Sequence, residues 1–427
     1  MEEEYRNILN AIRSGNVPAH GASSICMGRD KEIEEFTRIL DDVSNGKAIV
    51  KFINGEFGAG KSFFLKVIED LAYEKNFAVS WVNVSNDMPF NKIDIVYKNI
   101  ARTLRCKTGT SLEHIVKRWI TGLKMDAFNQ SADPQEQNRI VREAISLELS
   151  ETREHNNSFA TALEKYNQLI NAGDIEAGNA ALAWLRGDSN IPFPMKRRFG
   201  VKGDVTKENA LQFLEALSIF VRSIGYSGLV ILVDESEFIM NLHAKKYRDI
   251  AYNYIRDIFD GCNLGQFENS LFVFAGTPEW YEDSKVGVAS YVALHDRIRT
   301  SLDDSGNVNV RKPIFNLSGF NEEELDNVSK QIIEMHSVAY DWDANKKFES
   351  AIDEIIERAI DDASLTDGKV TPRIFIRQFI EALDVVEQNP DNFKTSADII
   401  ALFNFEEKPD WGFDDENEGE KDIFDDW

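Results

Sequence analysis

The segment Gly55-Glu56-Phe57-Gly58-Ala59-Gly60-Lys61-Ser62-Phe63 follows the apolar run Ala48–Asn54 and precedes a stretch with helical spacing. It satisfies the pattern G-x-x-x-x-G-K-[ST], in which glycines let backbone N–H groups close around phosphate oxygens at the start of a helix. In this pattern Lys61 reaches the β- and γ-phosphates and Ser62 ligates Mg²⁺. The sequence therefore predicts a phosphate-binding loop of the Walker A type, with Mg²⁺ beside the phosphates.

A second acidic motif follows another apolar run. Leu229–Val233 is followed by Asp234 and Glu235, and the carboxyl edge of an open α/β sheet is where ligands bind. Asp234 is expected to hold the hydration shell of Mg²⁺, and Glu235 to polarise an attacking water. Glu237 is a less favoured alternative as the base. The segment is therefore interpreted as a Walker B motif.

Short apolar strands separated by helical patterns favour a buried parallel sheet with helices on both faces. The predicted strands are Ala48–Asn54, Phe77–Val84, Gly228–Asp234 and Ser270–Gly276. Helical patterns recur between the second and third strands, including one over 134–155, and again after Leu317 to about residue 388. The fold class is therefore α/β: a parallel-sheet P-loop NTPase core with a large helical insertion and a C-terminal helical lid.

These patterns divide the chain into successive regions. The predicted regions are an N-terminal helix and loop (1–27), a P-loop ATPase core (28–105 and 206–316), a helical insertion (106–205), a helical lid (317–390) and an acidic C-terminal tail (391–427).

Further candidates for sensing the nucleotide lie downstream. Thr277 follows the strand Ser270–Gly276 and could contact the γ-phosphate or the water, or simply form a Thr-Pro turn. Arg297 and Arg299 could neutralise phosphate charge in a neighbouring subunit, or form surface salt bridges. Arg373 follows Thr371-Pro372 at the start of a helix and could contact phosphates from a lid.

The charge of the chain bears on its partners. Forty-eight Lys and Arg against 73 Asp and Glu give a net charge of −25, which opposes non-specific binding to nucleic acid or to an anionic membrane. The concentrated basic exception is a loop with Lys196, Arg197, Arg198 and Lys202. This loop could bind DNA backbone or an acidic partner, or fold onto the protein's own acidic surface.

The ends of the chain and its cysteines predict a cytoplasmic protein. No signal peptide and no membrane-length apolar run are visible. Three well-separated cysteines indicate neither a disulfide framework nor a zinc site. Residues 406–427 are strongly acidic, and we expect either a solvated tail or one whose Trp and Phe side chains anchor a partner.

Taken together, these motifs resemble an AAA+ ATPase of the origin-recognition-like branch. Ile12-Arg13-Ser14-Gly15, Gly28-Arg29-Asp30 and the Gly55–Phe63 segment are similar to the ATP-binding proteins of BREX phage-defence systems (BrxD-like). The resemblance implies ATP as the nucleotide, with Gly28 and Arg29 near the adenine, and action beside a helicase on or near DNA. Origin binding is not implied, because an acidic tail stands where an initiator has a winged helix.

The sequence thus predicts a Mg²⁺-dependent ATPase that acts with DNA-processing partners in anti-phage defence. A finger arginine acting in trans requires assembly, so either oligomerisation, such as a homo-oligomer, or an interface with a partner is expected. Two alternatives stay open: a nucleotide-gated interaction protein with little turnover, and a DNA-binding regulator.

Overall fold

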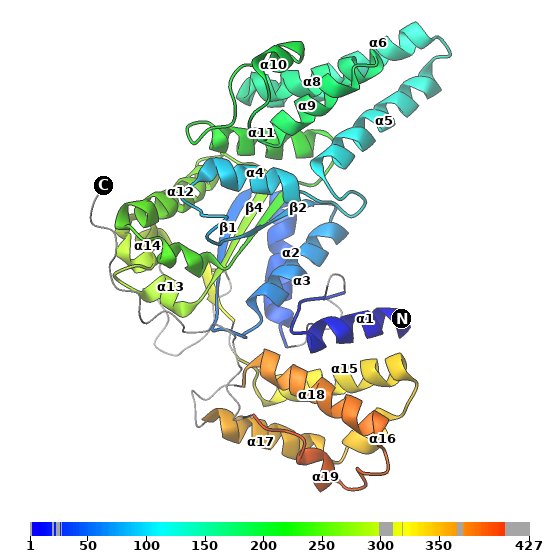
Figure 1. The fold of residues 1–427 in the computed structure, drawn as a ribbon, viewed down its shortest axis with the longest axis vertical. Coiled ribbons are helices and arrows are strands. Elements are labelled where there is room, and N and C mark those ends of the chain that lie inside the picture. Colours follow the sequence, from blue (N-terminus) through cyan, green and yellow to red (C-terminus); the bar gives the residue numbers. More distant parts are fainter. Residues whose placement is uncertain are drawn as a thin grey trace, which may run out of the picture. The chain divides into compact units, whose positions relative to one another are not determined.

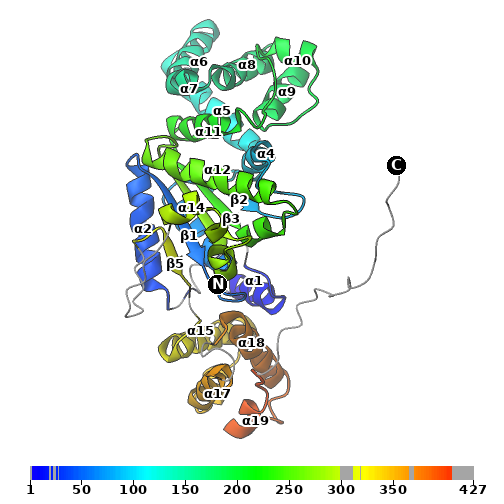
Figure 2. The ribbon, with the colours of Figure 1, turned by 90° about the vertical axis from the view of Figure 1, so that its left-hand side faces the viewer.

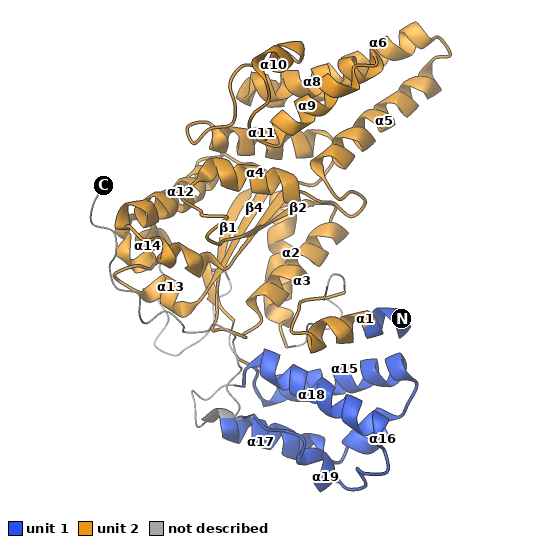
Figure 3. Ribbon diagram, in the orientation of Figure 1, with its two compact units in different colours: residues 1–6, 320–427 blue, residues 7–319 orange. Residues whose placement is uncertain are grey.

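The computed structural model describes residues 2–18, 21–22, 26, 28–298, 311–317, 319–364 and 370–405. The chain groups into two compact units, one formed by residues 7–319 and one by residues 1–6 with 320–427 (Figure 3). No helix in these described ranges combines the length and the apolar character that a membrane crossing requires.

The larger unit contains a five-stranded parallel sheet in the order β2-β3-β4-β1-β5. Its strands are β1 (Ala48–Asn54), β2 (Ala78–Asn83), β3 (Leu229–Asp234), β4 (Ser270–Gly276) and β5 (Ile314–Asn316). The first four coincide, within one residue at each end, with the predicted strands. Strand β5 is absent from the predicted strands, because its three residues are too few to form a recognisable apolar pattern. The sheet is consistent with a P-loop NTPase.

Helices cover both faces of this sheet (Figures 1 and 2). Side chains alternate along each strand, so Phe272 and Phe274 of β4 point to one core while Leu271 and Val273 point to the other. The second core is covered by α2 (Asp30–Ser44) and α3 (Lys61–Glu74). The first is covered by α4 (Ile93–Thr103), α11 (Ala210–Ser223) and α12 (Lys245–Asn263). Both faces are therefore buried, as the apolar strands predict.

The region between β2 and β3 carries a further group of helices. These are α5 (Leu112–Gln130), α6 (Pro134–Glu148), α7 (Ser150–His155), α8 (Asn157–Asn171), α9 (Ile175–Leu185) and α10 (Phe193–Arg198). The single helix predicted over 134–155 is wrong: α6 ends at Glu148 and α7 begins at Ser150. Between them, the backbone of the buried Leu149 has ψ 2°, which departs from helical geometry.

These helices join the same hydrophobic core as one face of the sheet. Trp119 of α5 meets Phe220 of α11 edge-on, with ring centroids 5.4 Å apart. Trp184 of α9 meets Phe213 of α11 in the same way at 5.3 Å. These contacts place α11 between the sheet and the inserted helices. Aromatic pairs of this kind bury large apolar areas, so they contribute strongly to the shared core.

The remaining helices of the larger unit are short apart from the first. They are α1 (Glu2–Arg13), whose first residues group with the smaller unit, α13 (Pro278–Glu282) and α14 (Val292–Ile298), with 3₁₀ turns at η2 (Ser236–Asn241) and η3 (Val288–Ser290).

The smaller unit is helical. It contains α15 (Glu322–Tyr340), α16 (Ala344–Phe348), α17 (Ile352–Ser364), α18 (Pro372–Gln388) and α19 (Ser396–Ile400). Packing continues past residue 391, where the sequence analysis begins the tail: Ile399 and Phe403 are buried, and Phe403 lies against Phe379. The apolar residues Ile399, Ile400 and Phe403 explain this extension. The acidic residues 406–427 lie outside the described residues.

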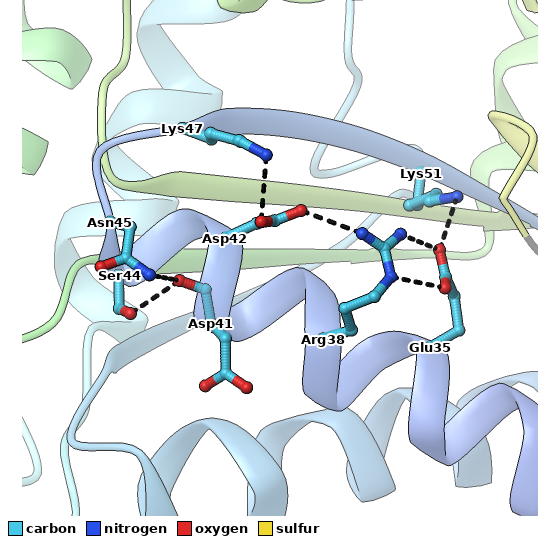
Figure 4. Close-up of polar contacts among 8 residues, drawn as sticks. All are labelled: Glu35, Arg38, Asp41, Asp42, Ser44, Asn45, Lys47 and Lys51. Carbon is cyan, nitrogen blue, oxygen red and sulfur yellow. Dashed lines mark hydrogen bonds and ion pairs between the residues drawn. The ribbon is translucent and has the colours of Figure 1, made fainter.

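A charged network at α2 contains a buried lysine (Figure 4). Lys51 of β1 is 4% exposed, its Nζ donates to the carbonyl oxygen of Lys312 at 2.7 Å, and it lies 3.9 Å from Oε1 of Glu35. Glu35 is also held by Arg38, which reaches Asp42 as well. Burial lowers the pKa of Lys51 to about 8, although the Glu35 carboxylate opposes this shift.

Replacing Lys51 with Met should stabilise the protein near pH 7 and flatten its pH dependence. Between pH about 8 and about 10.5, folded Lys51 has lost a proton that the unfolded chain still binds, so the free energy of unfolding of the wild type rises with pH there. Below that window the charge must be buried on folding. We expect a gain of about 1–2 kcal/mol, since the lost hydrogen bond offsets part of the relief.

Chemical denaturation across this pH range measures both effects as the difference between wild type and variant. Lys47→Met is the matched control, because Lys47 is exposed and pairs with Asp42 in the same network. Its effect should stay within about 0.5 kcal/mol. A wild-type stability advantage that is constant from pH 7 to 10 would show that Lys51 carries no buried charge.

Candidate functional site

The glycine-rich loop connects the carboxyl end of β1 to the start of α3. Gly58 and Gly60 have φ angles of +80° and +92°, in the left-handed region that favours glycine. Gly60 occupies the N-cap position of α3, so the helix begins directly at Lys61. The N–H of Gly55 donates to the carbonyl of Gly276, which ties the loop to the end of β4. The loop thus presents the amino end of a helix beside the sheet edge.

Lys61 lies buried under this loop. Its Nζ donates to the carbonyl oxygens of Gly55 at 2.7 Å and Glu56 at 3.1 Å, and lies 5.3 Å from the ring centroid of Phe57. Burial lowers the pKa of Lys61, while the carboxylates of Glu237 and Asp234 oppose that shift. The ammonium group is therefore held by weak internal acceptors that a phosphate oxygen can replace.

Asp234 ends β3 and faces the start of α3. Its side chain is buried, which raises its pKa, while a hydrogen bond with the Ser62 hydroxyl and another from the backbone N–H of Glu235, at 2.9 Å, lower it. The structure thus brings Ser62 and Asp234 together from two separate elements. Mg²⁺ binds typically through one or two protein ligands plus substrate phosphates, and this pair has that chemistry.

Glu235 and Glu237 follow Asp234 on a strained turn. Glu235 is exposed and has φ +55° and ψ 38°, a conformation that non-glycine residues rarely adopt. Partial desolvation raises the pKa of both glutamates, and the charge of Asp234 raises it further. Oε2 of Glu237 is buried and has no hydrogen-bond partner among the described residues. Two carboxylates therefore stand next to Lys61, and the less favoured Glu237 is the more buried one.

Thr277 and Tyr281 lie beyond β4. Thr277 is buried at the N-cap of α13 and makes no capping hydrogen bond with its side chain. Because Gly276 accepts from Gly55, Thr277 is one residue from the contact with the loop. Sequence reasoning missed Tyr281, whose hydroxyl donates to the carbonyl of Ile53 at 3.1 Å and so braces β1 just before the loop. No motif marks it; only its place on a short helix after β4 could have suggested it.

The arginine candidates separate. Arg297 makes a two-point ion pair with Asp260 of α12, in which Nη2 lies 2.8 Å from Oδ2. In this structure Arg297 thus forms a surface salt bridge, the second of the two roles that its sequence position allows. Arg299 lies outside the described residues. Arg373 is exposed near the start of α18 in the smaller unit. Before α2, Gly28 has φ +70° and Arg29 is buried, 3.9 Å from Glu32.

The basic segment predicted as a loop is a loop only over residues 199–202. Residues 193–198 form α10, because Pro192 and Pro194 favour a helix start there. Lys196 is buried and pairs with Asp204 at 2.6 Å, and Arg198 pairs with Asp174. Arg197 and Lys202 are exposed. Two of the four charges therefore bind the protein's own carboxylates.

One family model matches this chain over most of its length. A comparison with curated proteins finds no match. A family model described as BREX system ATP-binding protein BrxC/D matches residues 1–399, a span that includes the glycine-rich loop, Asp234 and the helices of the smaller unit through α18. With most of its length matched, the chain belongs to the BREX system ATP-binding protein BrxC/D family.

Proposed function

We propose that this ATP-binding protein hydrolyses ATP with Mg²⁺ as part of a bacterial anti-phage defence system. The observation that carries the proposal is the meeting of the Ser62 hydroxyl with the buried Asp234 carboxylate beside Lys61. Hydroxyl, carboxylate and lysine are the groups with which P-loop proteins hold Mg²⁺ and the β- and γ-phosphates. Oε2 of Glu237 is buried and has no hydrogen-bond partner among the described residues, which also favours a polar ligand at this site.

The residues divide the work as follows. Backbone N–H groups of the 55–60 loop and the start of α3 bind phosphate oxygens, and Lys61 exchanges its carbonyl acceptors for them. Bound Mg²⁺ neutralises charge on the phosphates. Glu235 orients a water and accepts its proton as the water oxygen bonds to the γ-phosphorus and the bond to the β-phosphate oxygen breaks. The products are ADP and inorganic phosphate.

Sensing and assembly extend this proposal. Thr277 stands at the sheet edge next to the loop and is suited to contact the γ-phosphate or the water. Arg297, Arg299 and Arg373 remain proposed contacts to phosphate, the first two from a neighbouring copy of the chain. Gly28, Arg29 and Phe63 are proposed to line the nucleotide site. The resemblance to BREX proteins supports a cytoplasmic role beside a helicase and other defence proteins.

Replacing Asp234 with Asn should stabilise the protein while abolishing Mg²⁺-dependent turnover. The amide keeps an acceptor for the N–H of Glu235 but removes one charge from a buried group of carboxylates. We expect phosphate release to fall by about 10²–10³-fold and the thermal midpoint without nucleotide to rise by about 1–3 °C. Steady-state phosphate release and thermal denaturation measure the two effects.

The matched control is Asp70→Asn on the same helix as Ser62, which should leave turnover unchanged. Wild-type protein that binds ATP but releases no phosphate with Mg²⁺, alone or with DNA, would overturn the hydrolysis proposal and favour the nucleotide-gated interaction protein. Binding to DNA that persists without nucleotide and exceeds any effect of ATP would favour the regulator.

A further inference from the structure

A groove separate from the glycine-rich loop opens beside the amino-terminal half of α12. It has a volume of about 620 Å³, and its lining includes Lys207, Lys245, Lys246, Tyr247, Tyr254 and Asn91. These residues come from α12, from the segment before α11 and from the segment before α4. The groove lies within the larger unit, whose α12 faces the viewer in Figure 2.

The charge at this groove is opposite to that of the chain. Its lining has three lysines, Lys207, Lys245 and Lys246, against the carboxylate of Asp249, whereas the protein as a whole carries −25. Lys245 pairs with Asp249 at 3.1 Å. Lys207 and Lys246 are exposed, and neither has a carboxylate within ion-pair distance in the described part of the chain. At least two ammonium groups are thus available to an anion.

The start of α12 adds to this positive field. The helix is 19 residues long and begins at Lys245, and Ala244 at its N-cap offers no side-chain acceptor to the first N–H groups. The amino end of the helix dipole therefore lies where two of the lysines project. A phosphate group fits this end of the groove.

Aromatic side chains accompany the lysines. Tyr247 is 49% exposed, an unusual state for a large side chain, and Tyr254 is half-buried in the same lining. Tyr291 is held in place because its hydroxyl donates to Oδ1 of Asn253 at 3.1 Å. The exposed Tyr247, next to Lys246, presents a flat face on which a base can stack while the phosphates contact the charges.

One buried polar atom is left unsatisfied in the lining. Asn91 is only 8% exposed, and its Oδ1 has no hydrogen-bond partner among the described residues. A buried acceptor without a partner costs free energy unless a ligand supplies a donor. The exocyclic amino group of a base is such a donor.

From these observations we propose that the groove binds a single strand of nucleic acid. Phosphates lie against Lys207, Lys245 and Lys246, a base stacks on Tyr247, and a base amino group donates to Asn91. A duplex does not fit this arrangement, because its base faces are stacked on one another and closed to Tyr247. The site is distinct from the ATP site, and it is also distinct from α10, where Lys196 is buried in its ion pair with Asp204, whereas Lys245 is exposed.

Fluorescence anisotropy of a fluorescein-labelled single DNA strand of about 16 nucleotides tests this with the full chain in the absence of ATP. Lys245→Ala with Lys246→Ala should weaken binding at least about tenfold and lower the slope of log affinity against log salt by about 1.4, since each phosphate contact on a single strand contributes about 0.7. Tyr247→Ala should weaken binding about tenfold without changing that slope.

The matched control is Lys117→Ala with Lys124→Ala on α5, which removes the same charge; Lys117 pairs with Glu113 one turn away, as Lys245 does with Asp249. This control should bind as the wild type does. Equal losses in both double variants, tighter binding of the same sequence as a duplex, or displacement by polyglutamate at matched charge would each overturn the proposal. Lys61→Ala should still bind the strand, so failure of the ATPase proposal would be seen separately.

Discussion

Replacing Lys61 with Ala should reduce the steady-state rate of phosphate release from ATP by about 10²–10³-fold. Lys61 carries the positive charge closest to the loop, and its Nζ is already held by the carbonyls of Gly55 and Glu56 under the predicted phosphate site. Without it, charge that develops on the phosphates in the transition state loses its nearest compensating group. Affinity for ATP should fall as well, because the ammonium also contacts the bound nucleotide.

Lys66→Ala is the control for this variant. Lys66 lies on the same helix and pairs with Glu69, away from the loop, so turnover should stay at the wild-type rate. Phosphate release at saturating ATP and titration with a fluorescent ATP analogue separate the rate from the affinity. Turnover by Lys61→Ala at the wild-type rate would remove the glycine-rich loop from the mechanism.

Replacing Glu235 with Gln should lower the turnover rate by about 10²–10⁴-fold while ATP binding is retained. Glutamine keeps the size of the side chain and cannot accept the proton of the attacking water. Glu235 follows directly after β3, and its backbone N–H donates to Oδ1 of Asp234. Its strained backbone conformation therefore sets the direction in which its side chain leaves the sheet edge. Single-turnover phosphate release, with ATP binding measured separately, distinguishes lost chemistry from lost binding.

Glu237→Gln identifies which carboxylate is the base. Glu237 is two residues away and more buried, and its unpaired Oε2 gives it a physical claim to the same role. If Glu235 is the base, Glu237→Gln should retain most of the turnover. The reverse pattern, with loss in Glu237→Gln and near-normal turnover in Glu235→Gln, would transfer the role to Glu237.

Much of the sheet could be predicted from the sequence because four of its strands are mostly apolar runs of strand length. Periodicity places Ala48–Asn54 and Ser270–Gly276 at their observed bounds. It cannot show that Tyr281 reaches back to Ile53, since that contact depends on how the chain returns after β4. Lys51 likewise reads as a polar residue in an apolar strand, and only packing of Glu35 and Lys312 around it explains its burial.

The groove beside α12 could not be predicted for the same reason. Asn91, Lys207 and Lys245 are far apart in sequence, and no spacing pattern links them. The basic segment at residues 196–202 is local in sequence, yet two of its four charges, Lys196 and Arg198, are paired with Asp204 and Asp174. Net charge along a sequence therefore indicates where cations are, but folding decides which remain available.

The aromatic contacts of α11 limit how this chain can be shortened. Trp119 and Trp184 cover Phe220 and Phe213, which belong to a helix that also packs on the sheet. The inserted helices therefore share the hydrophobic core of the larger unit, and their removal would expose part of it. A shortened chain that joined residue 105 to residue 206 would expose Phe213 and Phe220 to solvent. Such an exposed apolar patch favours aggregation, so this chain would need polar replacements at these positions to stay soluble.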